Sequence, residues 1–305
     1  MSRSSILLAA TSALAVFLPG CSDPAHTDVT APAAQRLYGA AQKVGNGTVR
    51  TYIVLGADGV TPTEVGVAMT ESAMDGLPAP SAMKGDMSSM KDMPAGAHAM
   101  ADMNMYILDL PAQNPTPYKF VQFDWNPAGH EPAGVYDKPH FDFHFYTVSR
   151  AFRDGILPTD GSYAAKAASF PAADFRAPFY VDAATAGNAP AAAAAVPQMG
   201  LHWLDVRSPE LQGLTGHPEA YKPFTTTFIY GSWDGQFIFD EPMITRAHIV
   251  AKHDATDPAV RDEVIPVSTP TRQSAAGYHP KAYRITWDAA AKEYRVALTQ
   301  LTKWN

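Results

Sequence analysis

Short segments in which apolar and polar residues alternate recur along the chain, and glycine or proline separates them. The first such segment is Thr48 to Leu55, whose sequence is TVRTYIVL. Because successive side chains of a β-strand point to opposite faces of a sheet, this period of two predicts a strand. By the same reasoning, further strands are expected at residues 64–70, 105–110, 119–125, 141–148, 225–230, 236–239, 283–287 and 293–299.

Turn sequences join two pairs of these strands. The segment Gly231-Ser232-Trp233-Asp234-Gly235 separates two aromatic strands, and residues 288–292 separate the last two. Both predict β-hairpins. Many short strands joined by such turns indicate a mostly β, antiparallel domain, either a sandwich or barrel-like, with a few short helices. An α+β fold is the alternative.

Four segments depart from this alternation. Residues 33–43 carry apolar side chains at helical spacing and predict a short helix before the domain. Residues 244–252 fit either a strand or a helix, and a helix is favoured. The alanine- and proline-rich segment 183–197 is expected to be a surface loop. Residues 69–105 form a methionine-rich insertion that holds nine of the twelve methionines.

The N-terminus has the pattern of a targeting segment. Arg3 precedes an apolar run from Ile6 to Leu18, which is shorter than the ~20 residues that a membrane-spanning helix needs. The run ends in the sequence LPGC, which looks like a bacterial lipobox, so Cys21 is the predicted site of lipidation. An ordinary secretory signal with a coincidental cysteine is the alternative.

This N-terminus sets the expected organisation and location. Residues 1–20 are a predicted lipoprotein signal peptide, residues 21–33 a tether and residues 34–305 a single mostly β domain. We expect the mature chain in the periplasm or cell envelope, anchored to a bacterial membrane through its N-terminal lipid.

Composition narrows the classes of function. Charged residues make up only 17%, the formal net charge is −7 and no block of lysine or arginine occurs, so binding to nucleic acid is disfavoured. The single cysteine excludes an intrachain disulfide, a cysteine-ligated zinc site and a cysteine-ligated iron–sulfur cluster. The motifs of serine hydrolases, dinucleotide-binding proteins and P-loop enzymes are absent from the sequence, so no motif indicates a reaction.

The densest candidate chemistry is a histidine-rich block between residues 129 and 146, which contains GHEP and PHFDFHFY. In its second part three polar residues alternate with three aromatic ones: His140, Asp142 and His144 with Phe141, Phe143 and Phe145. On a strand, the phenylalanines would enter the core and the polar residues would share the opposite face.

Strand geometry limits how these polar residues could bind a metal ion. His140 and His144 would lie ~13 Å apart at ~3.3 Å per residue, too far for two ligands at ~2.0–2.1 Å from one zinc ion. Adjacent members, at ~6.6 Å, are close enough. A site for one divalent ion therefore needs an adjacent pair and ligands from elsewhere.

The candidates for those further ligands are His130, His202 and Glu241, and either Glu131 or Glu241 is a candidate general base. Two other interpretations of the block stay open at this point. One is a buried hydrogen-bond network that contains no metal, and the other is exposed polarity without a function.

The methionine-rich insertion is a candidate site for a soft metal ion. Its thioethers recur at short intervals among small and polar residues that cannot form an apolar helix face. Thioethers select Cu(I) over hard cations. Core packing and a flexible insertion that scavenges oxidants are the alternatives. The candidate Cu(I) ligands are Met83, Met87, Met90, Met93, His98, Met100, Met103 and Met105.

Several segments together resemble a family of bacterial exported proteins of unknown function, whose structurally known member is a Thermus protein controlled by an extracytoplasmic-stress sigma factor. They are MYILDLP, TPYKFVQFDWNPAGHEPAGVYDKPHFDFHFY, MGLHWLD, TFIYGSWDGQFIFDEPMIT and YHPKAYRITWDAAAKEYRVALTQL. The resemblance covers roughly residues 48–301 and implies an exported, mostly β domain that forms a homo-oligomer. It implies no established activity, and residues 69–105 and 183–197 depart from the family core.

Two classes of function follow from these patterns. The first is a non-enzymatic envelope lipoprotein that acts in stress or binds a metal or small ligand. The second is a metal-dependent enzyme built on His140, Asp142, His144 and His202. Convergence of these four side chains near a concave surface would favour the enzyme.

Overall fold

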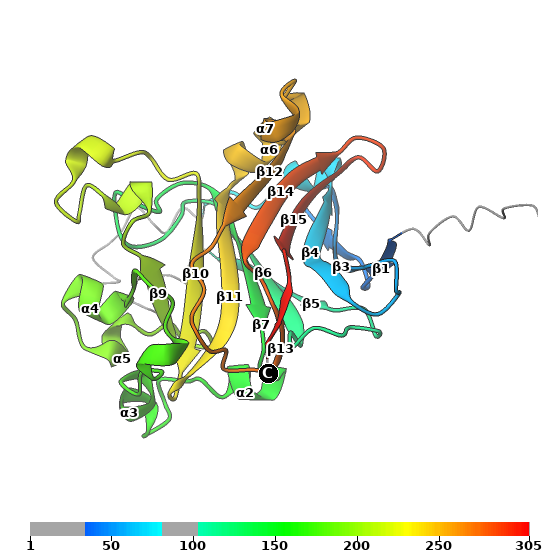
Figure 1. The fold of residues 1–305 in the computed structure, drawn as a ribbon. Helices are drawn as coiled ribbons and strands as arrows, with labels where there is room; N and C mark the ends of the chain where they lie inside the picture. The colour runs from blue at the N-terminus through cyan, green and yellow to red at the C-terminus, as the bar shows by residue number, and fades with distance from the viewer. Residues whose placement is uncertain (1–33, 81–102, 305) are drawn as a thin grey trace, which may run out of the picture. The chain divides into compact units, whose positions relative to one another are not determined.

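Two antiparallel sheets pack face to face in the computed structural model, which describes residues 34–80 and 103–304 (Figure 1). The first sheet has the strand order β1-β3-β4-β15-β14-β12, and β2 pairs with β3. Its strands are Gln35–Tyr38 (β1), Gln42–Val44 (β2), Gly47–Leu55 (β3), Pro62–Thr70 (β4), Asp262–Pro266 (β12), Ala282–Asp288 (β14) and Glu293–Thr299 (β15).

The second sheet has the strand order β5-β6-β7-β11-β10-β9-β8. Its strands are Asn104–Asp109 (β5), Phe120–Asn126 (β6), His140–Tyr146 (β7), Tyr180–Asp182 (β8), Leu201–Asp205 (β9), Thr226–Trp233 (β10) and Gln236–Thr245 (β11). A small third sheet pairs Gly277–His279 (β13) with Thr302–Trp304 (β16).

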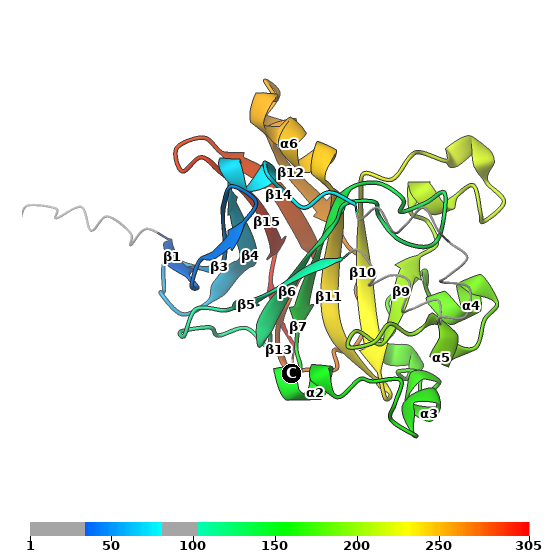
Figure 2. The same ribbon diagram turned by 180° about the vertical axis from the view of Figure 1, so that it is seen from behind.

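Short helices flank both sheets: those within residues 163–194 lie beside the second sheet, and those within residues 246–261 lie beside β12 and β14 of the first (Figures 1 and 2). The α-helices are Arg150–Asp154 (α2), Tyr163–Ala167 (α3), Ala183–Gly187 (α4), Ala191–Ala194 (α5), Arg246–Asp254 (α6) and Pro258–Arg261 (α7). Single 3₁₀ turns occur at Glu71–Met74, Ala173–Phe175, Pro209–Leu211 and Pro218–Ala220. In the part of the chain that the structure describes, none of the helices has the length and apolar character that crossing a membrane would require.

The main core lies between the two sheets and explains the alternation in β7. Phe141, Phe143 and Phe145 are all completely buried and pack in one cluster with side chains of the first sheet such as Ile53 and Val296. The prediction that the phenylalanines enter the core is therefore confirmed. The polar residues of β7 consequently face away from the first sheet.

The mostly β, antiparallel fold class is confirmed. Strands make up 39% and helices 18% of the described residues, and the sheets do not close into a barrel, so the arrangement is that of a sandwich. The predicted β10–β11 hairpin is also present, but β10 continues through Trp233. Asp234 and Gly235 form the turn with φ values of 50° and 79°, as the tight turns that match strand twist require.

Two predictions from local pattern are wrong. The helix predicted at residues 33–43 is absent from the described part, residues 34–43, because Leu37 and Tyr38 pair with β3 at the edge of the first sheet. Residues 183–197 are not simply a loop, because they contain α4 and α5. Asp182 caps α4 by accepting a hydrogen bond from the Thr185 N–H, and alanine has the highest helix propensity.

The favoured helix at residues 244–252 is present as α6, although its first two predicted residues belong to β11. Thr245 ends the strand and begins the helix, since its side chain accepts a hydrogen bond from the His248 N–H. The main part of the methionine-rich insertion, residues 81–102, lies outside the described residues, and so do the predicted signal peptide and the whole of the tether.

Candidate metal centre

The outer face of β7 carries a buried polar cluster. His140, Asp142 and His144 are 0%, 3% and 1% exposed, although they face away from the main core. On β6, Asp124 lies opposite Asp142. On β11, Met243 lies opposite Asp142, so Glu241, two residues earlier, lies beside His144.

The ligand-type side chains divide into two groups of three. We call His130, His140 and Asp142 the Asp142 group, and His144, His202 and Glu241 the Glu241 group. Within each group, one nitrogen or oxygen atom from every residue lies within 4.8 Å of the others. His140 and His144 fall into different groups, in keeping with their separation along the strand.

In the Asp142 group both imidazoles point their Nε2 atoms at one carboxylate. His140 Nε2 lies 3.2 Å from Asp142 Oδ1, and His130 Nε2 lies 3.7 Å from Asp142 Oδ2. The other ring nitrogens bond to backbone carbonyls: His140 Nδ1 to Lys138 O at 2.7 Å and His130 Nδ1 to Glu131 O at 2.8 Å. Asn126 Nδ2 donates to Asp142 Oδ2 at 2.7 Å and fixes the carboxylate.

The Glu241 group repeats this arrangement one step along the sheet. His144 Nε2 lies 3.4 Å from Glu241 Oε1, and His202 Nε2 lies 3.7 Å from Glu241 Oε2. Behind His144, its Nδ1 lies 3.3 Å from Asp124 Oδ2. Gln122 donates to the same Asp124 oxygen at 2.7 Å.

The distances fit ligands around an ion better than hydrogen bonds. Charge-assisted N–H···O bonds are about 2.7–2.9 Å long. Two ligand atoms at ~2.0–2.1 Å from a tetrahedral zinc ion are about 3.3–3.4 Å apart, and the four nitrogen–oxygen distances are 3.2–3.7 Å. Among the described residues, His140 Nε2, Asp142 Oδ1, His144 Nε2 and Glu241 Oε2 are buried without a hydrogen-bond partner.

Burial and neighbouring charges set the protonation of the cluster. Burial alone would lower the pKa of His144, but Glu241 and Asp124 outweigh it and raise this pKa to about 9. Burial, together with the charges of His144 and His130, lowers the pKa of His202 to about 3, so His202 is neutral. Burial raises the pKa of Glu241 despite the nearby His144.

Each group has one side that reaches solvent. The side chains of His130 and His202 are 19% and 17% exposed, whereas those of the other four residues are at most 4% exposed. Both groups therefore have one histidine near the surface and two deeply buried ligands.

The Phe239 ring packs against both histidines of the Glu241 group. Its ring centroid lies 4.8 Å from that of His144 and 5.4 Å from that of His202. The ring occupies this place because Gly231, opposite it on β10, has no side chain: a Cβ there would lie 2.0 Å from a ring atom. A side chain at position 231 would therefore collide with the Phe239 ring, so glycine is needed there.

The structure places six of the predicted site residues in two groups of three, so His140, Asp142, His144 and His202 do not converge on one ion as predicted, and Glu131 belongs to neither group. The Glu131 carboxylate accepts a hydrogen bond from the Ala133 N–H at 2.8 Å in an exposed loop, and its role as a general base stays a prediction. Sequence reasoning missed Asp124. Its signal was the same period of two, since Gln122, Asp124 and Asn126 alternate with Phe123 and Trp125.

The candidate Cu(I) ligands are only partly visible. Met83, Met87, Met90, Met93, His98 and Met100 lie outside the described residues. Met103 and Met105 are half-buried at the start of β5, and the Met105 sulfur accepts a hydrogen bond from Arg153 Nη2 at 2.8 Å. Met105 is thus engaged with α2.

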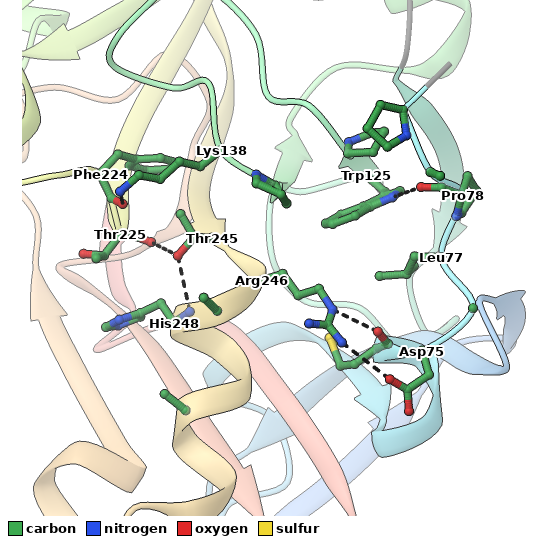
Figure 3. A pocket seen from close by; sticks show the side chains of 18 residues that line it. Asp75, Leu77, Pro78, Trp125, Lys138, Phe224, Thr225, Thr245, Arg246 and His248 are labelled. Carbon is green, nitrogen blue, oxygen red and sulfur yellow. Dashed lines mark hydrogen bonds and ion pairs between the residues drawn. The ribbon is translucent and has the colours of Figure 1, made fainter. Parts of the chain in front are cut away.

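A large pocket lies next to the cluster but does not contain its ligand atoms. It has a volume of about 800 Å³ and lies between the start of α6 and residues 74–80 (Figure 3). Lys138 and Phe224 line it and also contact the Asp142 group, since the Phe224 ring lies 5.5 Å from His140. Its Arg246 is held by Met74 O at 2.9 Å and by Asp75 at 3.4 Å.

A scan against models of protein families finds no match to this chain. Searches among curated proteins and among solved structures also find no match. Arguments about function therefore depend on the site itself.

Proposed function

We propose that this chain is a metal-binding protein of the cell envelope and that the Glu241 group holds a divalent transition-metal ion. The observation that carries the proposal is the spacing of buried atoms. His144 Nε2 and Glu241 Oε1 are 3.4 Å apart and lack hydrogen-bond geometry, as two ligands of one ion would be.

The donor set supports a borderline transition metal. Two imidazoles and one carboxylate match the sets that bind zinc and other divalent first-row metals, whereas magnesium and calcium prefer oxygen ligands alone. Asp124 behind His144 supplies the outer carboxylate that orients a ligating histidine. The exposed edge of His202 leaves room for a further ligand from solvent.

Metal analysis of the purified protein tests this proposal. The protein is stripped with a chelator, titrated with Zn(II) against a competing chelator and measured by mass spectrometry. Glu241→Gln and His202→Gln should each lower the Zn(II) affinity of the Glu241 group by more than ~100-fold, because even residues that only orient the ligands contribute ~10–100-fold to metal affinity. His217→Gln is the matched control, since the His217 side chain is 64% exposed. Unchanged Zn(II) affinity in both site variants, or no binding by wild type, would contradict the proposal.

The envelope location rests on the N-terminal sequence and on the resemblance to exported, stress-controlled proteins. We propose that Cys21 carries the lipid and that the domain works at the membrane surface, outside the cytoplasm. Cys21→Ser should move the protein from the membrane fraction to the soluble fraction. A variant that stays in the membrane with its signal segment uncleaved would overturn the lipoprotein assignment. Homo-oligomerisation, implied by the same resemblance, stays a prediction.

A metal-dependent enzyme is the second candidate. The favouring observation is that His130 and His202 open each group toward solvent, and catalytic metal sites keep such an open position. A Zn(II)-loaded protein that hydrolyses simple esters or phosphoesters, and loses this activity in Glu241→Gln, would support the enzyme over the binding protein.

A further inference from the structure

We infer that the Asp142 group is a second site for a divalent metal ion, so that the outer face of the second sheet binds two ions side by side. This inference rests on the proposed function, because it extends metal binding from the Glu241 group to its neighbour. It is carried by separate residues, namely His130, His140 and Asp142.

The hydrogen bonds of the two histidines fix where their lone pairs point. His140 Nδ1 and His130 Nδ1 each lie within hydrogen-bond distance of a backbone carbonyl, which accepts only from an N–H. In a neutral imidazole the proton is then on Nδ1, and Nε2 carries the lone pair. Two such lone pairs aimed at the Asp142 carboxylate would repel it unless either protons on Nε2 or a metal cation lay between the nitrogens and the carboxylate.

The dimensions of the group suit a metal ion as that cation. The nitrogen–oxygen distances of 3.2 and 3.7 Å bracket the ~3.3–3.4 Å edge of a tetrahedral zinc site. His140 Nε2 and Asp142 Oδ1 are buried and have no hydrogen-bond partner within the described ranges. Asn126 and the two carbonyls supply the outer hydrogen bonds that orient ligands around a metal.

The two groups are close neighbours, and their closeness has a consequence for affinity. Asp142 and His144 are two residues apart on β7, which corresponds to ~6.6 Å along a strand. Divalent ions at about this separation repel each other, while Asp142, Glu241 and Asp124 partly offset the repulsion. The second ion should therefore bind more weakly than the first, by tenfold or more.

Equilibrium dialysis with Zn(II) alone, followed by metal analysis, tests the second site. Wild type should bind two ions per chain in two steps. Glu241→Gln and Asp142→Asn should each bind one ion, and the double variant should bind none. His130→Gln, in which the altered side chain reaches solvent and does not threaten folding, should also bind one ion.

The outcomes separate the two proposals. If wild type binds one ion that Glu241→Gln loses and Asp142→Asn and His130→Gln keep, the second ion is refuted and the proposed function stands. If wild type binds one ion that every variant loses, the six residues form a single shared site and the second ion is again refuted. If wild type binds no ion, both proposals fail. Circular dichroism of each apo variant shows whether a loss reflects unfolding.

Discussion

The two faces of β7 differ in how completely their side chains satisfy one another. On the inner face, Phe141, Phe143 and Phe145 pack with apolar partners from both sheets. On the outer face, His140, Asp142 and His144 are equally buried, yet several of their polar atoms have no hydrogen-bond partner among the described residues. The inner face of β7 thus stabilises the fold, whereas the unpaired polar atoms of its outer face lower the stability of the fold.

That difference indicates which face serves function. A buried polar atom without a partner costs about 1–3 kcal/mol, and native proteins contain few of them. Sequences keep such groups where a ligand or ion completes them. The cluster around Glu263 is paired by contrast, since Glu263 contacts both His248 and Lys252.

The largest effect is expected when the inner face is disturbed. Phe143→Ala removes a completely buried ring from the main core and should cost about 3–5 kcal/mol through lost burial and a cavity. The free energy of unfolding of the apo protein in urea measures this loss, and the Zn(II) stoichiometry of the folded fraction should not change. Leu214→Ala is the control, because Leu214 is 68% exposed. A wild-type stability for Phe143→Ala would mean that the two faces had been assigned the wrong way round.

A smaller effect on stability, joined to an effect on metal, is expected at Gly231. Gly231→Ala places a methyl group against the Phe239 ring, which cannot swing away because it packs on Tyr146, His144 and His202. We expect a loss of about 1–3 kcal/mol from overpacking and a weaker Zn(II) affinity at the Glu241 group. Gly161→Ala, at an open position, should change neither quantity. An unchanged Zn(II) affinity in Gly231→Ala would show that Phe239 does not position the histidines.

The smallest effect is expected at the paired cluster, and it depends on pH. The hydrogen bond from His248, followed by that from the buried Lys252, lowers the pKa of Glu263 to about 2, although partial burial opposes this shift. Because the folded pKa lies below the ordinary value, this carboxylate stabilises the fold above pH ~4.5, and the contribution is lost as the pH falls toward ~2.

Glu263→Gln should therefore cost about 1–2 kcal/mol at neutral pH, less than for a fully buried pair because the Glu263 side chain is 32% exposed. The difference from wild type should shrink between pH ~4.5 and ~2 in urea denaturation, and Zn(II) binding should stay the same. Glu219→Gln, at a carboxylate that is 74% exposed, is the control. If Glu263→Gln lost Zn(II) instead, paired and unpaired polar clusters would not differ in role.

The sequence predicted the strands better than the segments around them. The alternation in β7 is unambiguous because a shift of one residue would expose three phenylalanines. Residues 33–43 were misassigned because a few apolar positions fit a helix as well as an edge strand, and only pairing with β3 distinguishes them. In residues 183–197, the alanine- and proline-rich composition suggested a loop. The N-cap at Asp182 is the local signal that indicates α4.

The candidate site was predictable as a set of residues but not as an arrangement. His130, His202 and Glu241 could be named because each lies in a short polar and aromatic context. Which of them joins His140 and which joins His144 depends on the strand order β7-β11-β10-β9, a long-range property that spacing along the chain does not contain. Asp124 was missed because its role appears only when β6 pairs with β7.

If the two groups bind ions as proposed, the position of His130 outside the sheet should give them different tolerance for ionic radius. All three residues of the Glu241 group lie on strands, β7, β9 and β11, whose ladder hydrogen bonds hold their spacing. The Asp142 group takes His130 from the connection between β6 and β7, which can adjust more readily. Calcium, which needs six to eight oxygen ligands at about 2.3–2.6 Å, should be rejected by the first group. The Asp142 group should accept a wider range of ion sizes, so one binding site would be more selective among metal ions than the other.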